Sequence, residues 1–137
     1  MPLARQALHE SAEQIHVATW PTVREMHQVA SRHYAFEGRC FVLACGSIMR
    51  AADLPAALPL AEDLRADPEQ LVLRGGSAII GPDGGYLAGP TFDEETVLFA
   101  DLRLADIDRE SMTLDTTGHY ARPDVFEFSV TRRRPGS

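Results

Sequence analysis

The chain has no lysine among its 137 residues, because all thirteen of its basic residues are arginines. Any mechanism that needs a catalytic lysine is therefore excluded for these residues by themselves. Cysteine is scarce too, with Cys40 and Cys45 lying five residues apart in one apolar run. If that run is a strand, five residues span about 16 Å, which is too far for a disulfide. We expect two reduced thiols, as in cytoplasmic proteins.

Long hydrophobic stretches are also missing. No apolar run approaches the roughly 18–20 residues that a membrane span needs, and the first residues lack the layout of a signal peptide. These features predict a cytoplasmic protein with no membrane partner. The net charge of −7 argues against a nucleic-acid partner. The one basic cluster is the Arg-rich segment 131–137, which we expect to be a disordered tail.

What is present indicates a single domain with an apolar core, since 45% of the residues are hydrophobic and only 24% are charged. Periodicity predicts helices at 2–13 and 22–37 and strands at 14–20 and 40–45. Segment 47–70 is interrupted by three prolines and predicts short helical turns in a surface excursion. The apolar stripes of the two helices are Leu3, Ala4, Ala7 and Leu8, and Val23, Met26, Ala30 and Tyr34.

The second half of the chain predicts mostly strands. Runs at 76–81 and 86–90 flank Pro82-Asp83-Gly84-Gly85 and form a hairpin with favourable turn residues. A further strand is expected at 96–104, a helical turn at 106–112 and an extended tail at 115–130. This order predicts an α/β (α+β) fold, with a mixed β-sheet and helices on one face.

Few residues are candidates for catalysis or for metal or phosphate binding. Cys45-Gly46-Ser47 ends a predicted strand, where nucleophiles are often presented, but no histidine base is placed beside it. A small apolar residue in a buried strand is the favoured interpretation. No histidine spacing matches a metal site, and Gly75-Gly76 and the 81–85 loop lack the Lys-Ser/Thr of a P-loop. We therefore expect no metal and no cofactor.

Five segments, in order, resemble the C-terminal half of the nitrilase or carbon–nitrogen hydrolase family. The first two are Met1-Pro2-Leu3-Ala4-Arg5, with the strand Glu13-Gln14-Ile15-His16-Val17-Ala18-Thr19-Trp20-Pro21, and Ala35-Phe36-Glu37-Gly38-Arg39-Cys40-Phe41-Val42-Leu43. They continue with the hairpin from Gly75 to Pro90, the strand-like segment 94–104, and Thr117-Gly118-His119-Tyr120-Ala121-Arg122-Pro123-Asp124-Val125-Phe126. The resemblance implies a partial nitrilase-like domain over 1–130, forming half of a four-layer α-β-β-α sandwich.

The same resemblance implies hydrolysis of a nitrile to a carboxylic acid and ammonia by a Glu-Lys-Cys triad. Cysteine attacks the nitrile carbon, glutamate accepts the thiol proton, and lysine stabilises the charge that builds on nitrogen. All three positions correspond to residues before Met1, so we expect the chain alone to be inactive. A truncated gene product, an expressed fragment and one half of a split enzyme all remain open. The alternative is a non-catalytic module that pairs with a complementary half or with another nitrilase subunit.

The family comparison also suggests roles for particular residues. Trp20 and Pro21 resemble positions that border the substrate pocket, although a core tryptophan at a strand end is equally consistent with the sequence. Glu37 resembles a glutamate that braces the fold. His119, Arg122 and Asp124 are expected to clamp the tail to neighbouring strands or to a second subunit. A homo-oligomer through helices 2–13 and 22–37 is predicted, as is a nitrile or amide substrate for the complete enzyme.

Overall fold

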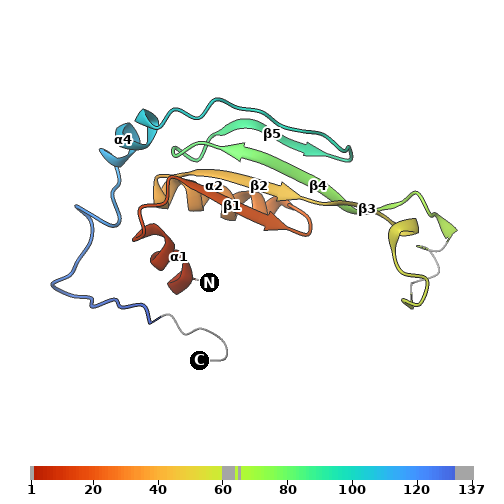
Figure 1. Cartoon of the computed structure of the whole chain (residues 1–137), viewed down its shortest axis with the longest axis horizontal. Helices are drawn as coiled ribbons and strands as arrows, with labels where there is room; N and C mark the ends of the chain where they lie inside the picture. Colours follow the sequence, from red (N-terminus) through yellow and green to blue (C-terminus); the bar gives the residue numbers. More distant parts are fainter. Residues whose placement is uncertain (1, 60–63, 65, 132–137) are drawn as a thin grey trace.

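The computed structural model describes residues 2–59, 64 and 66–131, so Met1 and all of the Arg-rich tail except Thr131 lie outside the described residues. The helices are α1 (Pro2–His9), α2 (Glu25–Gly38) and α4 (Ala105–Ser111), with a 3-10 turn η1 (Ala51–Asp53). The strands are β1 (Ile15–Trp20), β2 (Phe41–Gly46), β3 (Ile48–Arg50), β4 (Leu71–Ile80) and β5 (Tyr86–Phe92). The predicted mixed α/β architecture is confirmed (Figure 1).

The five strands form one mixed sheet. β1 pairs in parallel with β2, and α2 connects the two strands. β2 and β3 follow one another along the same edge of the long strand β4, both antiparallel to it. β5 occupies the other edge of β4 as the second strand of the predicted hairpin. The turn is closed by the Gly81 N–H bonding to the Gly85 carbonyl at 2.8 Å.

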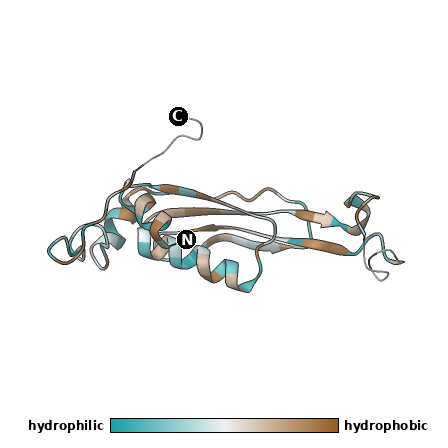
Figure 2. Ribbon diagram, turned by 90° about the horizontal axis from the view of Figure 1, so that it is seen from below, coloured by the Kyte–Doolittle hydropathy of each residue, from teal (hydrophilic) through white to brown (hydrophobic). Residues whose placement is uncertain are grey.

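Helix α2 lies along one face of the sheet (Figures 1 and 2). It buries Gln28, Ser31 and Ala35, whereas Met26 of the predicted stripe is 70% exposed. Polar residues can face the sheet because distant groups satisfy them. The Gln28 side chain donates to the Gly76 carbonyl at 2.7 Å and accepts from the Tyr86 hydroxyl at 2.9 Å. The core beneath α2 consists of Ala35, Cys40, Val42, Ala44, Ala78 and Ile80.

Helix α1 is shorter than predicted and is oriented differently. It ends at His9 instead of near residue 13, and Leu3 of its apolar stripe is 73% exposed. The residue it buries is His9, which is 5% exposed. The predicted helix extension forms a turn, where Ala12 has a φ of 56°, outside the helical region.

The strand expected at 96–104 is not formed, because no neighbouring strand within the described chain is hydrogen-bonded to it. The segment runs back along β5 toward α4 (Figure 1). The side chains nevertheless alternate in burial as they would in a strand. Leu98, Ala100 and Leu102 are half-buried, whereas Val97 and Phe99 are 72% and 83% exposed.

The remaining differences lie in segments rich in proline or glycine. Part of the predicted surface excursion, Ile48–Arg50, pairs with β4 as β3. Gly75 and Gly76 lie inside β4, at a register shift opposite β5. Their φ values of 77° and 89° lie in the region that only glycine adopts readily. No helix among the described residues is long and apolar enough to cross a membrane.

The C-terminal segment is tied to the fold by Arg39 and Glu37, and not by the predicted residues. The Arg39 guanidinium donates to the Leu114 carbonyl at 2.9 Å, and the Thr116 hydroxyl donates to the Glu37 carbonyl at 3.0 Å. Among the described residues, the Arg122 side chain bonds to its neighbour Asp124 alone, and both side chains are 62% exposed. The expected clamp from Arg122 and Asp124 to neighbouring strands is therefore wrong, because those two side chains satisfy each other.

Candidate functional site

The carboxyl ends of the parallel strands β1 and β2 lie side by side. Thr19 is paired with Cys45 and Trp20 with Gly46, so the segments that follow both strands leave the sheet at one edge. Ligand sites in α/β sheets commonly lie in the crevice outside the carboxyl ends of parallel strands. This edge is therefore the first place where the fold could form a site.

The backbone at this edge is tightly packed. The Ser47 N–H donates to the Pro21 carbonyl at 3.2 Å, and the Gly75 N–H donates to the Ser47 carbonyl at 2.9 Å. A Cβ added to Gly46 would lie 2.2 Å from the Gly75 carbonyl oxygen, which only glycine avoids. The Gly46 N–H also donates to the Ser77 hydroxyl at 3.0 Å.

A small polar hollow of about 200 Å³ opens at the same edge. Two carboxylates from the segment after β5 contribute to its wall, which gives the hollow an acidic character. Its lining residues are Gly46, Ile48, Gly75, Ser77, Thr91, Glu94, Glu95 and Thr96.

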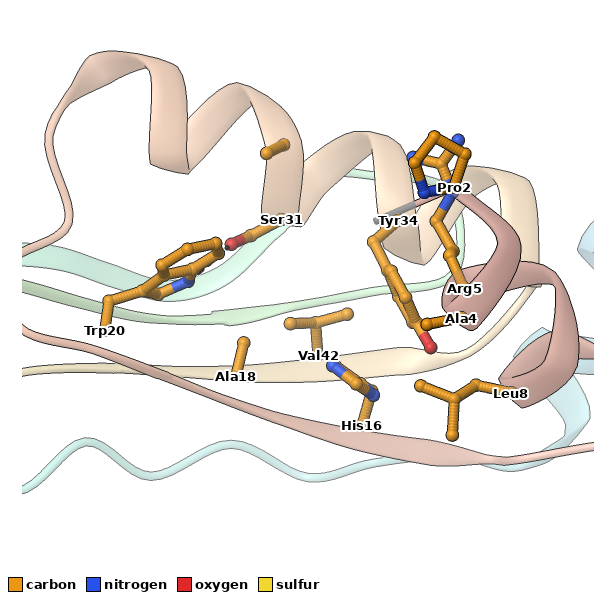
Figure 3. A pocket seen from close by; sticks show the side chains of 11 residues that line it. Pro2, Ala4, Arg5, Leu8, His16, Ala18, Trp20, Ser31, Tyr34 and Val42 are labelled. Atoms are coloured by element: carbon orange, nitrogen blue, oxygen red, sulfur yellow. Dashed lines mark hydrogen bonds between the residues drawn. The ribbon is translucent and has the colours of Figure 1, made fainter. Parts of the chain in front are cut away.

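A second cavity, of about 340 Å³, lies between α1, α2 and the sheet (Figure 3). This volume is in the range of small-molecule sites. Its walls are largely apolar, with an aromatic ring at each end and one arginine from α1. The lining residues are Pro2, Ala4, Arg5, Leu8, His16, Ala18, Trp20, Ala30, Ser31, Tyr34 and Val42.

The neighbouring residues Trp20 and Pro21 lie in different surroundings. The Trp20 indole lines the cavity between α1, α2 and the sheet, its N–H donates to the Ser31 hydroxyl at 3.3 Å, and its ring lies 4.8 Å from the His27 ring. Pro21 is exposed at the carboxyl edge, where its carbonyl accepts the bond from Ser47. Only Trp20 of the two neighbours lines a cavity described above, and contact of either residue with a substrate stays a prediction.

The two cysteines have different environments. Cys40 is fully buried, and burial raises the pKa of its thiol to about 12. Cys45 is exposed. Side chains alternate along β2, so Cys45 lies on the opposite face of the sheet from Val42 and Ala44, which pack under α2. His16 and His27 line the helix side of the sheet, toward Tyr34 and Trp20. No histidine in the described part of the chain forms a bond with Cys45, so the thiolate-forming pair that a cysteine hydrolase needs is not assembled there.

Sequence reasoning missed a polar cluster around His9. The side chains of Glu13, His16, Tyr34 and Glu37 converge on it from three elements. The spacing of four between His9 and Glu13 signals part of it, but the approach of α2 depends on tertiary packing. Among the described residues, no three His, Cys, Asp or Glu side chains are arranged to hold a metal ion.

A βαβ unit extended by an antiparallel hairpin, with helix α2 packed on one face of the mixed sheet, defines a layered α/β protein. The carbon-nitrogen hydrolase family model matches residues 1–110. A nitrilase of Bradyrhizobium diazoefficiens is 43% identical over 97% of this chain and 41% of its own length. An arylacetonitrilase of Trametes versicolor is 42% identical over 95% and 41%. The chain belongs to the carbon–nitrogen hydrolase family.

The structural comparison agrees on the fold. A carbon-nitrogen hydrolase from Helicobacter pylori superposes with a TM-score of 0.67 at 16% identity, covering 90% of this chain and 43% of that one. An aliphatic nitrilase of Sinorhizobium fredii, 38% identical, is covered over 42% of its length. The chain thus spans about two fifths of the length of the curated relatives it matches. The predicted family is confirmed, and the predicted domain boundary at residue 130 stays a prediction.

Proposed function

We propose that this chain forms the C-terminal portion of a nitrilase-type carbon–nitrogen hydrolase, which converts a nitrile into a carboxylic acid and ammonia. The observation that carries the proposal is the 43% identity over 97% of this chain to a protein named as a nitrilase. Identity at that level, continuous along the chain, makes a shared reaction class the simplest explanation.

The chain contributes the frame and part of the pocket, and not the reacting groups. Nitrile hydrolysis by an activated thiol needs a nucleophile, a base and a cation at the developing negative charge. The sequence contains no lysine, and its exposed Cys45 has no histidine bonded to it within the described residues. The triad therefore comes from residues outside this sequence, and the chain alone should be inactive.

Trp20 is the residue of this chain best placed to contact a substrate side chain. An indole beside apolar walls suits the hydrocarbon part of a nitrile, and the 340 Å³ cavity next to it accommodates a small molecule. Pro21 would border the pocket from the carboxyl edge of β1. Both assignments are part of the proposal.

The proposed partner is a complementary half that covers the face of the sheet opposite α2. On that face, Ile15 and Val17 of β1 are 46% and 58% exposed. Apolar side chains exposed on one face of a sheet favour a partner that covers them.

Complementation tests this function directly. The chain would be mixed, or produced together, with the part of the Bradyrhizobium diazoefficiens nitrilase that it does not match. Ammonia release from aliphatic and aromatic nitriles would then be measured for the pair and for each piece alone. Activity in the pair only is the expected result. No activity from a pair that does associate would contradict the proposal, and so would activity of this chain alone that disappears in Cys45→Ala.

An interaction module without catalysis is the second candidate, and the exposed helix surface favours it. Leu3, Leu8, Met26 and Val29 are 73%, 41%, 70% and 49% exposed on α1 and α2. Such side chains suit a symmetric contact in which each patch is used twice. A homo-oligomer through predicted helices 2–13 and 22–37 belongs to both candidates, and the complementation assay separates them.

A further inference from the structure

His9 is a buried titratable side chain at the end of α1. Its side chain is 2% exposed, and its ring packs directly over Gly38, where an added Cβ would lie 2.3 Å from two ring atoms. Within the described residues, neither ring nitrogen has a hydrogen-bond partner. A buried imidazole with both nitrogens unbonded is rare and lowers the stability of the fold, so its presence needs an explanation.

Charged and polar groups face His9 from every element packed around it. From α1 comes Arg5, whose guanidinium lies 2.8 Å from Glu37. From the following turn comes Glu13, 3.8 Å from the His9 ring, and from α2 comes Glu37, 3.7 Å from it. The remaining groups are Tyr34, whose ring is 4.5 Å away and whose hydroxyl donates to Glu13, and His16, His33 and Asp115.

This cluster gives α1 its charged and polar contacts. Leu3 of the apolar stripe is 73% exposed, whereas Ala4 and Leu8 line the cavity between α1, α2 and the sheet. The ionisable contacts that reach across to α2 are those of Arg5 and His9 with Glu37. Because part of the attachment of α1 runs through ionisable groups, its strength depends on their protonation.

We propose that His9, buried in its neutral form over Gly38, is a proton-controlled latch that holds α1 against α2 and the sheet. The latch positions the segment that leads into α1. Its consequence for activity rests on the proposed function, because in a nitrilase-type domain that leading segment would carry the nucleophile. His9 is then a positioning residue, acting through α1 without touching the substrate.

The direction of the pH response follows from the environment of His9. Desolvation lowers its pKa below the ordinary value of 6.5, and Glu37 and Glu13 oppose this shift only in part. The docked helix therefore binds a proton less readily than the undocked helix does. Docking is at full strength above pH 6.5 and weakens as the pH falls below it.

Amide hydrogen exchange of the intact chain tests the latch. Corrected for intrinsic exchange rates, protection of residues 6–10, whose amides are the ones bonded within α1, should fall several-fold between pH 7.5 and pH 5.5, while that of residues 28–38 in α2 stays constant. Emission of Trp20, which is the sole tryptophan and lines the cavity beside α1, should shift to the red over the same range. Constant protection of residues 6–10 in the unmodified chain would overturn the proposal.

Matched variants separate the latch from general histidine titration. His9→Gln keeps a neutral polar side chain, so α1 protection should become independent of pH. His119→Gln changes an exposed histidine of the tail and should leave the response unchanged. Should His9→Gln fail to fold, Glu37→Gln provides the second test. It removes the charge that pairs with Arg5, so α1 should lose protection at pH 7.5, and unchanged protection would contradict the latch.

The same variants report on the proposed function separately. In a complemented enzyme, His9→Gln should remove the acid-side fall in kcat that His119→Gln retains. The exchange and fluorescence readouts require no nitrile turnover. A chain that fails in complementation can therefore still show the latch, and an active pair without pH-dependent α1 protection would overturn the latch alone.

Discussion

Arg39 occupies the position that ends α2, with a φ of 48° in the left-handed region. Glycine is the usual residue there, and Gly38 comes one residue earlier. The arginine is retained at this strained position because its side chain, 5% exposed, reaches three acceptors. They are the carbonyls of Pro82 and Leu114 and the hydroxyl of Thr113, at 3.0, 2.9 and 3.2 Å.

Replacing Arg39 by methionine should destabilise the chain by about 3 kcal/mol, because several bonds from a charged donor are lost and buried acceptors are left unsatisfied. Urea unfolding followed by circular dichroism measures the change. Arg122→Met is the matched control, since Arg122 pairs with Asp124 in solvent, and it should leave the midpoint unchanged. Equal midpoints for both variants would show that Arg39 does not join these segments.

The two thiols should react at very different rates. Alkylation at pH 8 should label exposed Cys45 within minutes and leave Cys40 unlabelled until the chain unfolds, as read by mass spectrometry. Burial raises the pKa of Cys40 from 9.0 to about 12. Its contribution to stability is therefore complete below pH 9 and is lost as the pH rises toward 12. A Cys45→Ser chain that still takes up label rapidly while folded would contradict this burial.

At the scale of elements, α2 combines polar inner side chains with apolar side chains outside. The inner residues Gln28 and Ser31 accept or donate bonds to β4, β5 and Trp20, whereas Met26 and Val29 are 70% and 49% exposed. An amphipathic helix usually buries its apolar stripe. We expect these exposed side chains of α2 to meet a second subunit.

Leu8→Asp and Met26→Asp should each shift a dimer toward monomer or aggregate in sedimentation velocity. A two-fold interface uses each residue twice, so each substitution introduces two charges into the contact. Met112→Asp is the control, because Met112 is 88% exposed and lies outside both helices. An unchanged mass for the two helix variants would place any interface elsewhere on the chain.

For the whole molecule, the uncovered face of the sheet governs stability. It is limited in extent, because Phe41 is 1% exposed and Leu43 and Ile79 on the same face are half-buried. The most exposed part lies on β1, at Ile15 and Val17. Each 100 Å² of apolar surface that a partner covers contributes about 2.5 kcal/mol, a substantial share of the roughly 5–15 kcal/mol stability of a domain.

The isolated chain should therefore bind a hydrophobic dye, aggregate on mild heating, and lose dye binding when a complementary half is added. Val17→Thr keeps the side-chain shape and should reduce dye fluorescence without loss of β-sheet signal. The measurements are dye fluorescence and a thermal melt at low concentration. A sharp, cooperative melt from a dye-negative monomer would show that the sheet needs no cover.

Local patterns in the sequence determined much of the fold. The alternation in 14–20, the apolar run 40–45 and the Pro-Asp-Gly-Gly turn place β1, β2 and the hairpin correctly, because period and turn chemistry depend on neighbouring residues alone. The segments resembling carbon–nitrogen hydrolases also indicated the family, since they keep their order along the chain. Alternation along 96–104 also separates its half-buried side chains from its exposed ones.

Tertiary structure alone decided which faces are buried and which side chains meet. Gln28 is buried because Gly76 and Tyr86, far along the chain, satisfy its amide. His9 is buried because Gly38 leaves room for its ring. Segment 96–104 stays unpaired because the described chain offers it no hydrogen-bonded edge. In each case the deciding partner is distant in sequence, and the periodicity of a single segment contains no information about it.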